Sequence, residues 1–292
     1  MGFSAFPETP EIPEIPSPPP DPEPEEVTAL RTLINNNIAA LIDGKEPATS
    51  MPLFTTCNHA TSTYVRNTNC FLHGLQSIEA SSVWNSTTWQ GGLSAIRRPV
   101  IAITPHVVMW AWHTDGVGVG KTVRFVRDDN TVVERIIAPL PGPMTGYEQY
   151  DGRIRIGGTD IGLSAVAEPL PVDFQYQKFF PLLDPNILSL AASGDETLCL
   201  MQQGGALEHP DKLASIGRLN SYWNPAKSRV TLPDWWEGIY SGDSGFRSGI
   251  PLDGAFIVTR WEVARNVAAI NQAIADLGYP GESVRVVSLV GE

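Results

Sequence analysis

Hydrophobic residues recur every three or four positions near the start of the chain, over about residues 25–43. This spacing places them on one face of an α-helix and predicts an amphipathic helix there. Glu25 and Glu26 favour the start of the helix, and Gly44 favours its end. The hydrophobic face could pack on the chain's own domain or on another copy. Its members are Val27, Leu30, Leu33, Ile34, Ile38, Leu41 and Ile42.

From about residue 82 onward, the pattern changes to short runs rich in β-branched residues. Turn-forming residues separate these runs, and Asp129-Asn130 is typical of a hairpin turn. Since no helical pattern lies between the runs, we expect antiparallel sheets in a barrel or a sandwich. A helix over 262–277 and a last strand over 284–290 are predicted to follow. The other predicted strands are 100–104, 122–126, 131–137, 161–166, 197–201, 229–232 and 255–259.

Negative charge is concentrated at the N-terminus. The whole chain of 292 residues carries −12, and residues 1–26 hold seven acidic residues, nine prolines and no basic residue. We expect this segment to be an extended acidic strap, either disordered or held by a partner. The charge argues against a nucleic-acid partner, which would require a basic face. No hydrophobic run is long enough for a membrane span, and residues 1–24 do not have the pattern of a signal peptide.

Three short segments carry candidate chemistry. Residues 241–245 read Ser-Gly-Asp-Ser-Gly, and glycines beside Ser244 permit a tight turn that aims backbone amides at one spot. A serine hydroxyl needs a base to become a nucleophile, and His113 ends a segment that begins with a strand. Asp160 opens a hydrophobic strand and could orient that histidine. The three residues occur in the order His113, Asp160, Ser244, with gaps of 47 and 84 residues.

On these motifs, the region from about residue 82 to 277 resembles the trypsin/chymotrypsin-like serine peptidases. That family has a strand, a Ser/Thr-Ala/Pro step and Ala-His, then Asp-Ile-Ala-Leu, then Gly-Asp-Ser-Gly. The resemblance implies that Ser244 is the nucleophile, His113 the base and Asp160 its orienting partner. It also implies an oxyanion hole made of the Gly242 and Ser244 amides. Gly238 would then lie at the floor of the first specificity pocket, and Thr259 would contact the substrate.

The same resemblance implies an all-β fold of two antiparallel barrels of the chymotrypsin type, followed by a C-terminal helix. We place a strap at 1–26, a helix and irregular extension at 27–80, and the peptidase domain at 81–292. Within that domain, barrel one is expected at about 82–170, barrel two at about 180–262, and a helix and strand at 262–290. Trp112 stands where the family usually has Ala, and we expect this side chain to be buried.

Other candidate sites have simpler interpretations. His106 lies closer to the predicted strand than His113 and could be the base, although the family's spacing selects His113. Residues 116–122 resemble a phosphate-binding loop, but a strand follows them, so a hairpin loop is the better interpretation. Three interpretations stay open for the Cys/His-rich stretch: a zinc site, a disulfide, or unpaired structural residues. Its members are Cys57, His59, Cys70 and His73.

Two functions fit these patterns. The first is a serine endopeptidase that cleaves peptide or protein substrates without a metal or other cofactor. The alternative is a virion decoration or surface-assembly protein that uses a trypsin-like fold as a structural module. In either case residues 1–43 could attach the chain to a larger assembly, and the compartment is left open. With no acidic residue at position 238, a hydrophobic substrate side chain is the better expectation.

Overall fold

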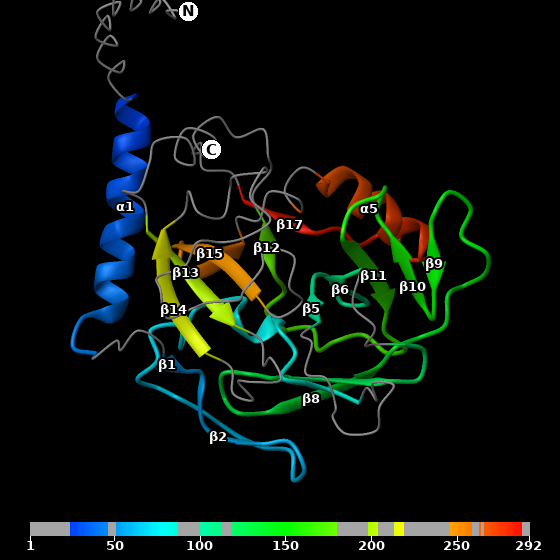
Figure 1. The fold of residues 1–292 in the computed structure, drawn as a ribbon, viewed down its shortest axis with the longest axis horizontal. Helices are drawn as coiled ribbons and strands as arrows, with labels where there is room; N and C mark the ends of the chain where they lie inside the picture. Colours follow the sequence, from blue (N-terminus) through cyan, green and yellow to red (C-terminus); the bar gives the residue numbers. More distant parts are fainter. Residues whose placement is uncertain are drawn as a thin grey trace, which may run out of the picture.

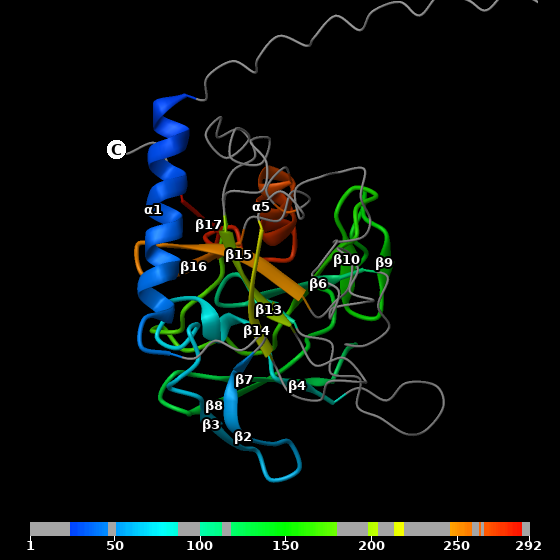
Figure 2. The ribbon, with the colours of Figure 1, turned by 60° about the vertical axis from the view of Figure 1, so that its left-hand side comes forward.

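The computed structural model describes residues 24–45, 51–86, 100–112, 118–179, 198–203, 213–218, 246–258, 263 and 266–287. Within these residues the chain is mostly β-sheet with few helices, and the expected all-β class is confirmed at that level (Figures 1 and 2). No helix in the described part of the chain is long and hydrophobic enough to cross a membrane.

The largest sheet has seven strands in the order β1-β14-β13-β15-β16-β12-β17. Most neighbours are antiparallel, but β12 pairs in parallel with both β16 and β17, which corrects the expectation of purely antiparallel sheets. The parallel pairing with β17 is possible because α5 lies in the connection between β16 and β17. The strands are β1 (Met51–Pro52), β12 (Lys178–Phe179), β13 (Leu198–Gln203), β14 (Leu213–Arg218), β15 (Phe246–Leu252), β16 (Ala255–Val258) and β17 (Arg285–Val286).

A second sheet has the strand order β5-β6-β11-β10-β9, and all its neighbours are antiparallel. The sequence predicted no strand over residues 107–111, but these residues form β6. The strand is possible because a tight turn at 104–107 reverses the chain immediately after β5. The strands are β5 (Ile101–Ala102), β6 (Val107–Ala111), β9 (Gln149–Tyr150), β10 (Arg153–Arg155) and β11 (Ile161–Ala165).

Two smaller sheets complete the β structure. One has the order β4-β7-β8, and its β7–β8 hairpin turns at Asp129-Asn130 as predicted. The other is the β2–β3 hairpin, in a stretch for which the sequence predicted no regular element. The strands are β2 (Phe54–Asn58), β3 (Thr63–Arg66), β4 (Trp84–Asn85), β7 (Thr122–Val126) and β8 (Val132–Ile136). A short 3-10 helix, η1 (Ile78–Ala80), precedes β4.

Hydrogen bonds also join the five-stranded and three-stranded sheets at two edges. At one edge, Ser81 pairs with Ile101, and the Ser82 amide donates to the Val100 carbonyl at 2.8 Å. At the other, Ile137 pairs with Val166, and the Ala138 amide donates to the carbonyl at the end of β11 at 2.9 Å. Isolated bridges therefore connect segments beside the two sheets at both places.

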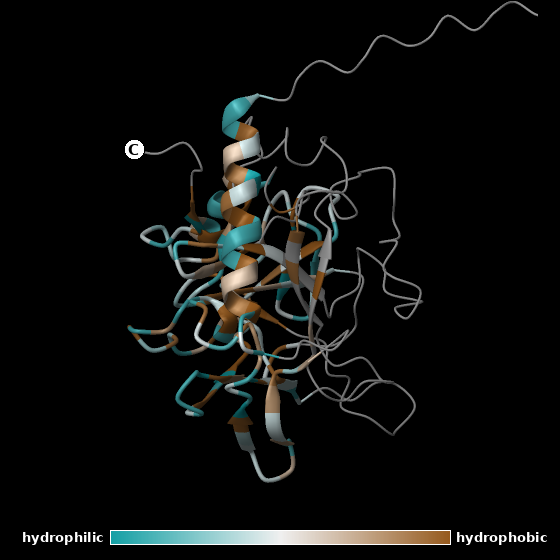
Figure 3. Cartoon of the chain, turned by 90° about the vertical axis from the view of Figure 1, so that its left-hand side faces the viewer, coloured by the Kyte–Doolittle hydropathy of each residue, from teal (hydrophilic) through white to brown (hydrophobic). Residues whose placement is uncertain are grey.

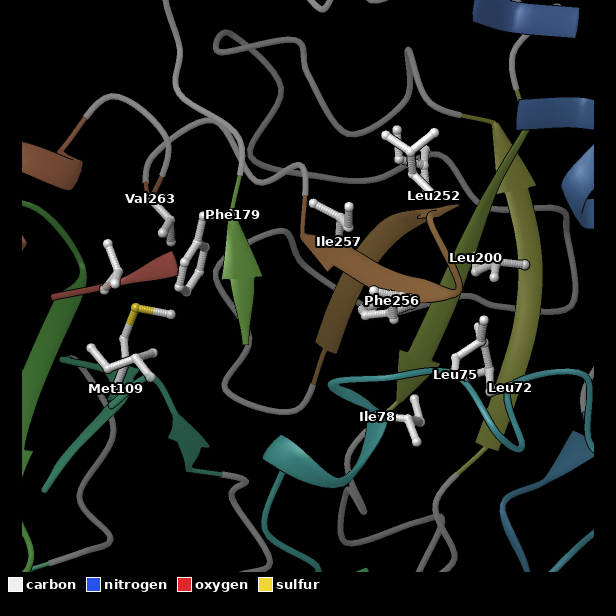
Figure 4. Close-up of a cluster of buried hydrophobic side chains, with 14 of the residues drawn as sticks. Leu72, Leu75, Ile78, Met109, Phe179, Leu200, Leu252, Phe256, Ile257 and Val263 are labelled. Carbon is white, nitrogen blue, oxygen red and sulfur yellow. The ribbon is translucent and has the colours of Figure 1, made fainter. Parts of the chain in front are cut away.

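β6 lies between two hydrophobic clusters. All five of its residues are buried, with Val108 and Trp110 in one cluster and Val107 and Met109 in the other. The second cluster extends to the seven-stranded sheet, and Figure 4 shows Met109 beside Phe179 of β12. Because both faces of β6 are covered, the residues at its end are held firmly in place.

The predicted N-terminal helix is confirmed as α1 (Glu25–Ile42). It packs on β13 and β15 of the same chain and buries Val27, Ile34 and Ile38. The Asn37 side chain donates to the Pro251 carbonyl at 3.0 Å, so polar contacts also fix the helix on the sheet. Hydrophobic and hydrophilic positions alternate along α1 in Figure 3.

A further helix, α5 (Val267–Asp276), lies within the predicted 262–277. Val263 is also helical, and residues 262, 264 and 265 lie outside the described residues. Ile270, Ala273 and Ile274 are buried, as the hydrophobic stripe predicted. The predicted last strand over 284–290 is reduced to β17 within the described residues. The strand predicted over 229–232 lies outside them.

Candidate active site

Of the predicted site residues, the structure describes Asp160. His113, Gly238, Gly242, Ser244 and Thr259 lie outside the described residues. The strands next to His113, Ser244 and Thr259 along the chain are described, whereas Gly238 lies within a longer stretch outside the described residues.

β6 and β11 bring the histidine and aspartate segments together. The two strands are antiparallel neighbours, and Ala111 at the end of β6 pairs with Ile161 at the start of β11. One residue further, the Trp112 amide donates a hydrogen bond to the Asp160 carbonyl at 2.9 Å. Asp160 therefore sits beside the residue that immediately precedes His113, and it is half-buried.

A hairpin turn between β10 and β11 presents Asp160. Gly157 and Gly158 have φ of 43° and 75°, a conformation that residues with a Cβ rarely adopt. The Thr159 hydroxyl donates to the Ile156 carbonyl at 2.6 Å and accepts from the Ile161 amide at 3.1 Å. These contacts fix the backbone on both sides of Asp160.

Trp112 is half-buried, rather than fully buried as expected, and it packs against arginine side chains. The Arg153 guanidinium lies 4.7 Å from the Trp112 ring centre and 5.0 Å from that of Trp110. Arg153 lies on β10 and Trp110 on β6, the two neighbours of β11, and Trp112 directly follows β6. Gly162 of β11 lies between these strands and has no side chain that could separate the rings from the guanidinium. The exposed ring of Tyr150 covers the same guanidinium at 5.0 Å.

The segments next to Ser244 and Thr259 come from one hairpin. β15 begins at Phe246, two residues after Ser244, and β16 ends at Val258, one residue before Thr259. Because the two strands are antiparallel neighbours, the start of β15 and the end of β16 lie at the same end of the hairpin. Val258 at the end of β16 pairs with Gly249, three residues after the start of β15.

His106 has a partner of its own. Its Nδ1 lies 2.5 Å from the Glu282 carboxylate, and its ring stacks on Tyr279 with a centre separation of 4.4 Å. These contacts tie the turn between β5 and β6 to the segment after α5.

The glycine-rich segment before β7 is not followed by a helix. Lys121 closes a turn by donating its amide to the Gly118 carbonyl at 3.0 Å, and β7 begins at the next residue. A phosphate-binding loop needs a helix there, because the helix N-terminus supplies the anion site.

Cys57 and Cys70 are not joined by a disulfide. Among the described residues, no group of three or more His, Cys, Asp or Glu side chains is placed to share a metal ion. Burial raises the pKa of the Cys70 thiol, which makes it a poor nucleophile. The remaining interpretation, structural residues, fits this stretch best.

Sequence reasoning did not single out β10, whose two arginines line the histidine and aspartate segments. The only signal was position: Arg153 and Arg155 directly precede the glycine turn that leads to Asp160. Their position beside the histidine and aspartate segments depends on the strand order, in which β11 lies between β10 and β6.

Comparisons with known proteins add little to this geometry. No protein-family model matches the chain, and no curated protein matches its sequence. Among solved structures, the chain is similar to neuropsin, a serine protease expressed in the limbic system of mouse brain, with 14% identity and a TM-score of 0.39. That match covers 69% of this chain and 98% of the neuropsin chain. A similarity at this level assigns neither fold nor activity.

Proposed function

We propose that the chain is a serine endopeptidase with a trypsin-like arrangement of His113, Asp160 and Ser244. The observation that carries this proposal is the pairing of the end of β6 with the start of β11. That pairing ends with the hydrogen bond that the Trp112 amide donates to the Asp160 carbonyl at 2.9 Å. In this arrangement the Cα atoms of His113 and Asp160 would be no more than about 9 Å apart, because consecutive Cα atoms are about 3.8 Å apart and paired Cα atoms about 5.5 Å. Side chains at that separation can meet.

The trypsin-like architecture has support from the edges of the sheets. In our proposal β5, β6, β11, β8, β7 and β4 form the first barrel, over about 82–170. The pairings Ser81 with Ile101 and Ile137 with Val166 support closure of this ring. β14, β13, β15 and β16, which are antiparallel neighbours in that order, would belong to a second barrel over about 180–262.

In the proposed reaction, the Ser244 hydroxyl attacks the carbonyl carbon of the scissile peptide bond while His113 takes its proton. Asp160 orients the imidazole and stabilises its protonated form. The amides of Gly242 and Ser244 donate to the oxyanion of the tetrahedral intermediate. His113 then gives the proton to the leaving amine, and a water molecule activated by the same base hydrolyses the acyl-enzyme.

Substrate binding is proposed on the serine side. Gly238 would form the floor of the first pocket, which without an acidic group would take a hydrophobic side chain. Thr259 follows the last residue of β16 along the chain and would pair with the substrate backbone. No cofactor is required for this chemistry.

The proposal is tested by reacting the purified full-length chain with a fluorophosphonate, which labels activated serines. We expect labelling at Ser244, its loss in Ser244→Ala, and a rate loss of about 10⁴-fold in Asp160→Asn. Ser241→Ala is the matched control, because it removes a serine from the same loop and should leave labelling intact. Absence of labelling in the folded wild-type protein would overturn the proposed function.

A further inference from the structure

Among the residues around Asp160, Arg155 contacts both the turn before Asp160 and the Trp112 ring. It pairs with Gly162 across β10 and β11, and its side chain extends along the glycine turn towards the end of β6. Its Nε donates to the Thr159 carbonyl at 2.6 Å, and Nη2 donates to the Gly158 carbonyl at 3.3 Å. Two consecutive carbonyls just before Asp160 are therefore held by one guanidinium group.

The other contacts of Arg155 fix the guanidinium itself. Nη1 donates to the Glu148 carboxylate at 2.8 Å, and the guanidinium carbon lies 5.8 Å from the centre of the Trp112 ring. The Arg155 amide also donates to the Glu148 carbonyl at 2.9 Å, so backbone and side chain of Glu148 both contact this arginine. Only a planar group with several donors can satisfy these directions together.

We infer that Arg155 is a positioning residue for the candidate triad. It connects the turn that carries Asp160 with Trp112, the residue before His113, and so fixes the two candidate catalytic groups relative to each other. This inference rests on the proposed function and adds to it a residue that does not touch substrate. Catalysis is sensitive to such positioning, because a misplacement of about 1 Å can cost about 100-fold in rate.

Two variants of Arg155 separate the effect of its planar donors from the effect of its positive charge. Arg155→Lys keeps the positive charge but lacks the planar donors, and Arg155→Ala removes both. We expect both variants to lower the second-order rate of Ser244 labelling by a fluorophosphonate, by about 10- to 100-fold. Arg135→Ala is the matched control, since Arg135 is also half-buried and donates through Nε to a backbone carbonyl, that of Pro169, at 2.8 Å. The control should label at the wild-type rate.

The pH dependence of the labelling rate gives a second measurement. A loss of fold stability alone would not change its midpoint. Loosening Asp160 weakens stabilisation of the protonated imidazole, so the pH midpoint of labelling that belongs to His113 should shift to lower pH in Arg155→Lys, which keeps the positive charge. Removing the positive charge of Arg155 without any loosening would shift it to higher pH instead. A wild-type rate and midpoint in Arg155→Lys would overturn the inference.

Amide hydrogen exchange tests the same inference without activity. The Trp112 amide, which donates to Asp160, should exchange faster in Arg155→Lys and Arg155→Ala, and should be unchanged in Arg135→Ala. Unchanged exchange in all three variants would count against a positioning role. If wild-type Ser244 is not labelled, the proposed function fails; if it is labelled and the Arg155 variants behave like wild type, only the role of Arg155 fails.

Discussion

At the scale of single residues, Gly162 determines how the aromatic side chains pack beside Asp160. A Cβ added at this position would lie 3.3 Å from the Trp110 ring, tighter than ordinary van der Waals contact. Trp110 is buried and cannot move freely, so we expect Gly162→Ala to lower the free energy of unfolding by about 1–3 kcal/mol. Urea denaturation measures this loss. The matched control is Gly142→Ala, because a Cβ at Gly142 meets nothing within 4 Å.

Substitution of either histidine near β6 is predicted to have an opposite effect on the labelling of Ser244. His106 is occupied by Glu282 and Tyr279, whereas His113 follows the strand end that pairs with the Asp160 segment. We expect His106→Gln to keep Ser244 labelling by a fluorophosphonate and His113→Gln to lose it. The reverse result would assign the base to His106 and would overturn the proposed triad.

Some site features could be predicted from residues alone, and others depend on the fold. The order of His113, Asp160 and Ser244, and the strand that begins after Asp160, are visible in the sequence because they are local. The role of Arg155 is not, since it depends on β10 lying next to β11 and β11 next to β6. Neighbour relations of this kind arise from pairing between distant segments.

At the scale of elements, strands with clear boundaries were predicted well. The predicted 122–126 coincides with β7, and 161–166 exceeds β11 by one residue. β6 was missed because both its faces are buried, so hydrophobic and polar residues do not alternate, and Pro105 before it favours a turn. The β2–β3 hairpin was missed because it is rich in Thr and Asn and is largely exposed.

Contacts between elements also predict a dependence of stability on pH. The Tyr147 hydroxyl, in the loop before β9, donates to the Asp276 carboxylate of α5 at 2.7 Å. Partial burial, followed by this hydrogen bond and the charge of Asp276, raises the pKa of Tyr147 to about 12 from 10.0. Because the folded state favours the protonated phenol, its stabilising contribution is complete below pH 10 and is lost as the pH rises through about 12.

The consequence is tested by comparing the wild type with Tyr147→Phe. The urea midpoint of the wild type should fall more steeply than that of the variant between pH 10 and 12. The difference between the two curves isolates Tyr147, since other tyrosines with a raised pKa are common to both proteins. Parallel curves would show that the contact with Asp276 does not form in solution.

At the scale of the whole molecule, α1 belongs to the body of the protein. Its Val27, Ile34 and Ile38 are buried in the same hydrophobic cluster as the seven-stranded sheet. The sequence could not decide between packing on the chain's own domain and packing on another copy, because an amphipathic stripe does not identify what covers it. We expect Ile38→Ala to lower the free energy of unfolding by about 2–5 kcal/mol, as measured by urea denaturation.

The boundary between α1 and the preceding strap gives the last prediction. The Pro24 carbonyl accepts hydrogen bonds from the Val27 and Thr28 amides at 3.0 and 3.2 Å, so a deletion should stop at residue 23. We expect the chain without residues 1–23 to keep its melting temperature and its Ser244 labelling, because those residues supply none of the proposed site. Deletion of residues 1–43 is the contrasting variant, and it should destabilise the fold because it removes α1 from β13 and β15. A melting temperature lowered by the shorter deletion would show that the acidic strap stabilises the body of the protein, and would contradict its predicted role in attachment to a larger assembly.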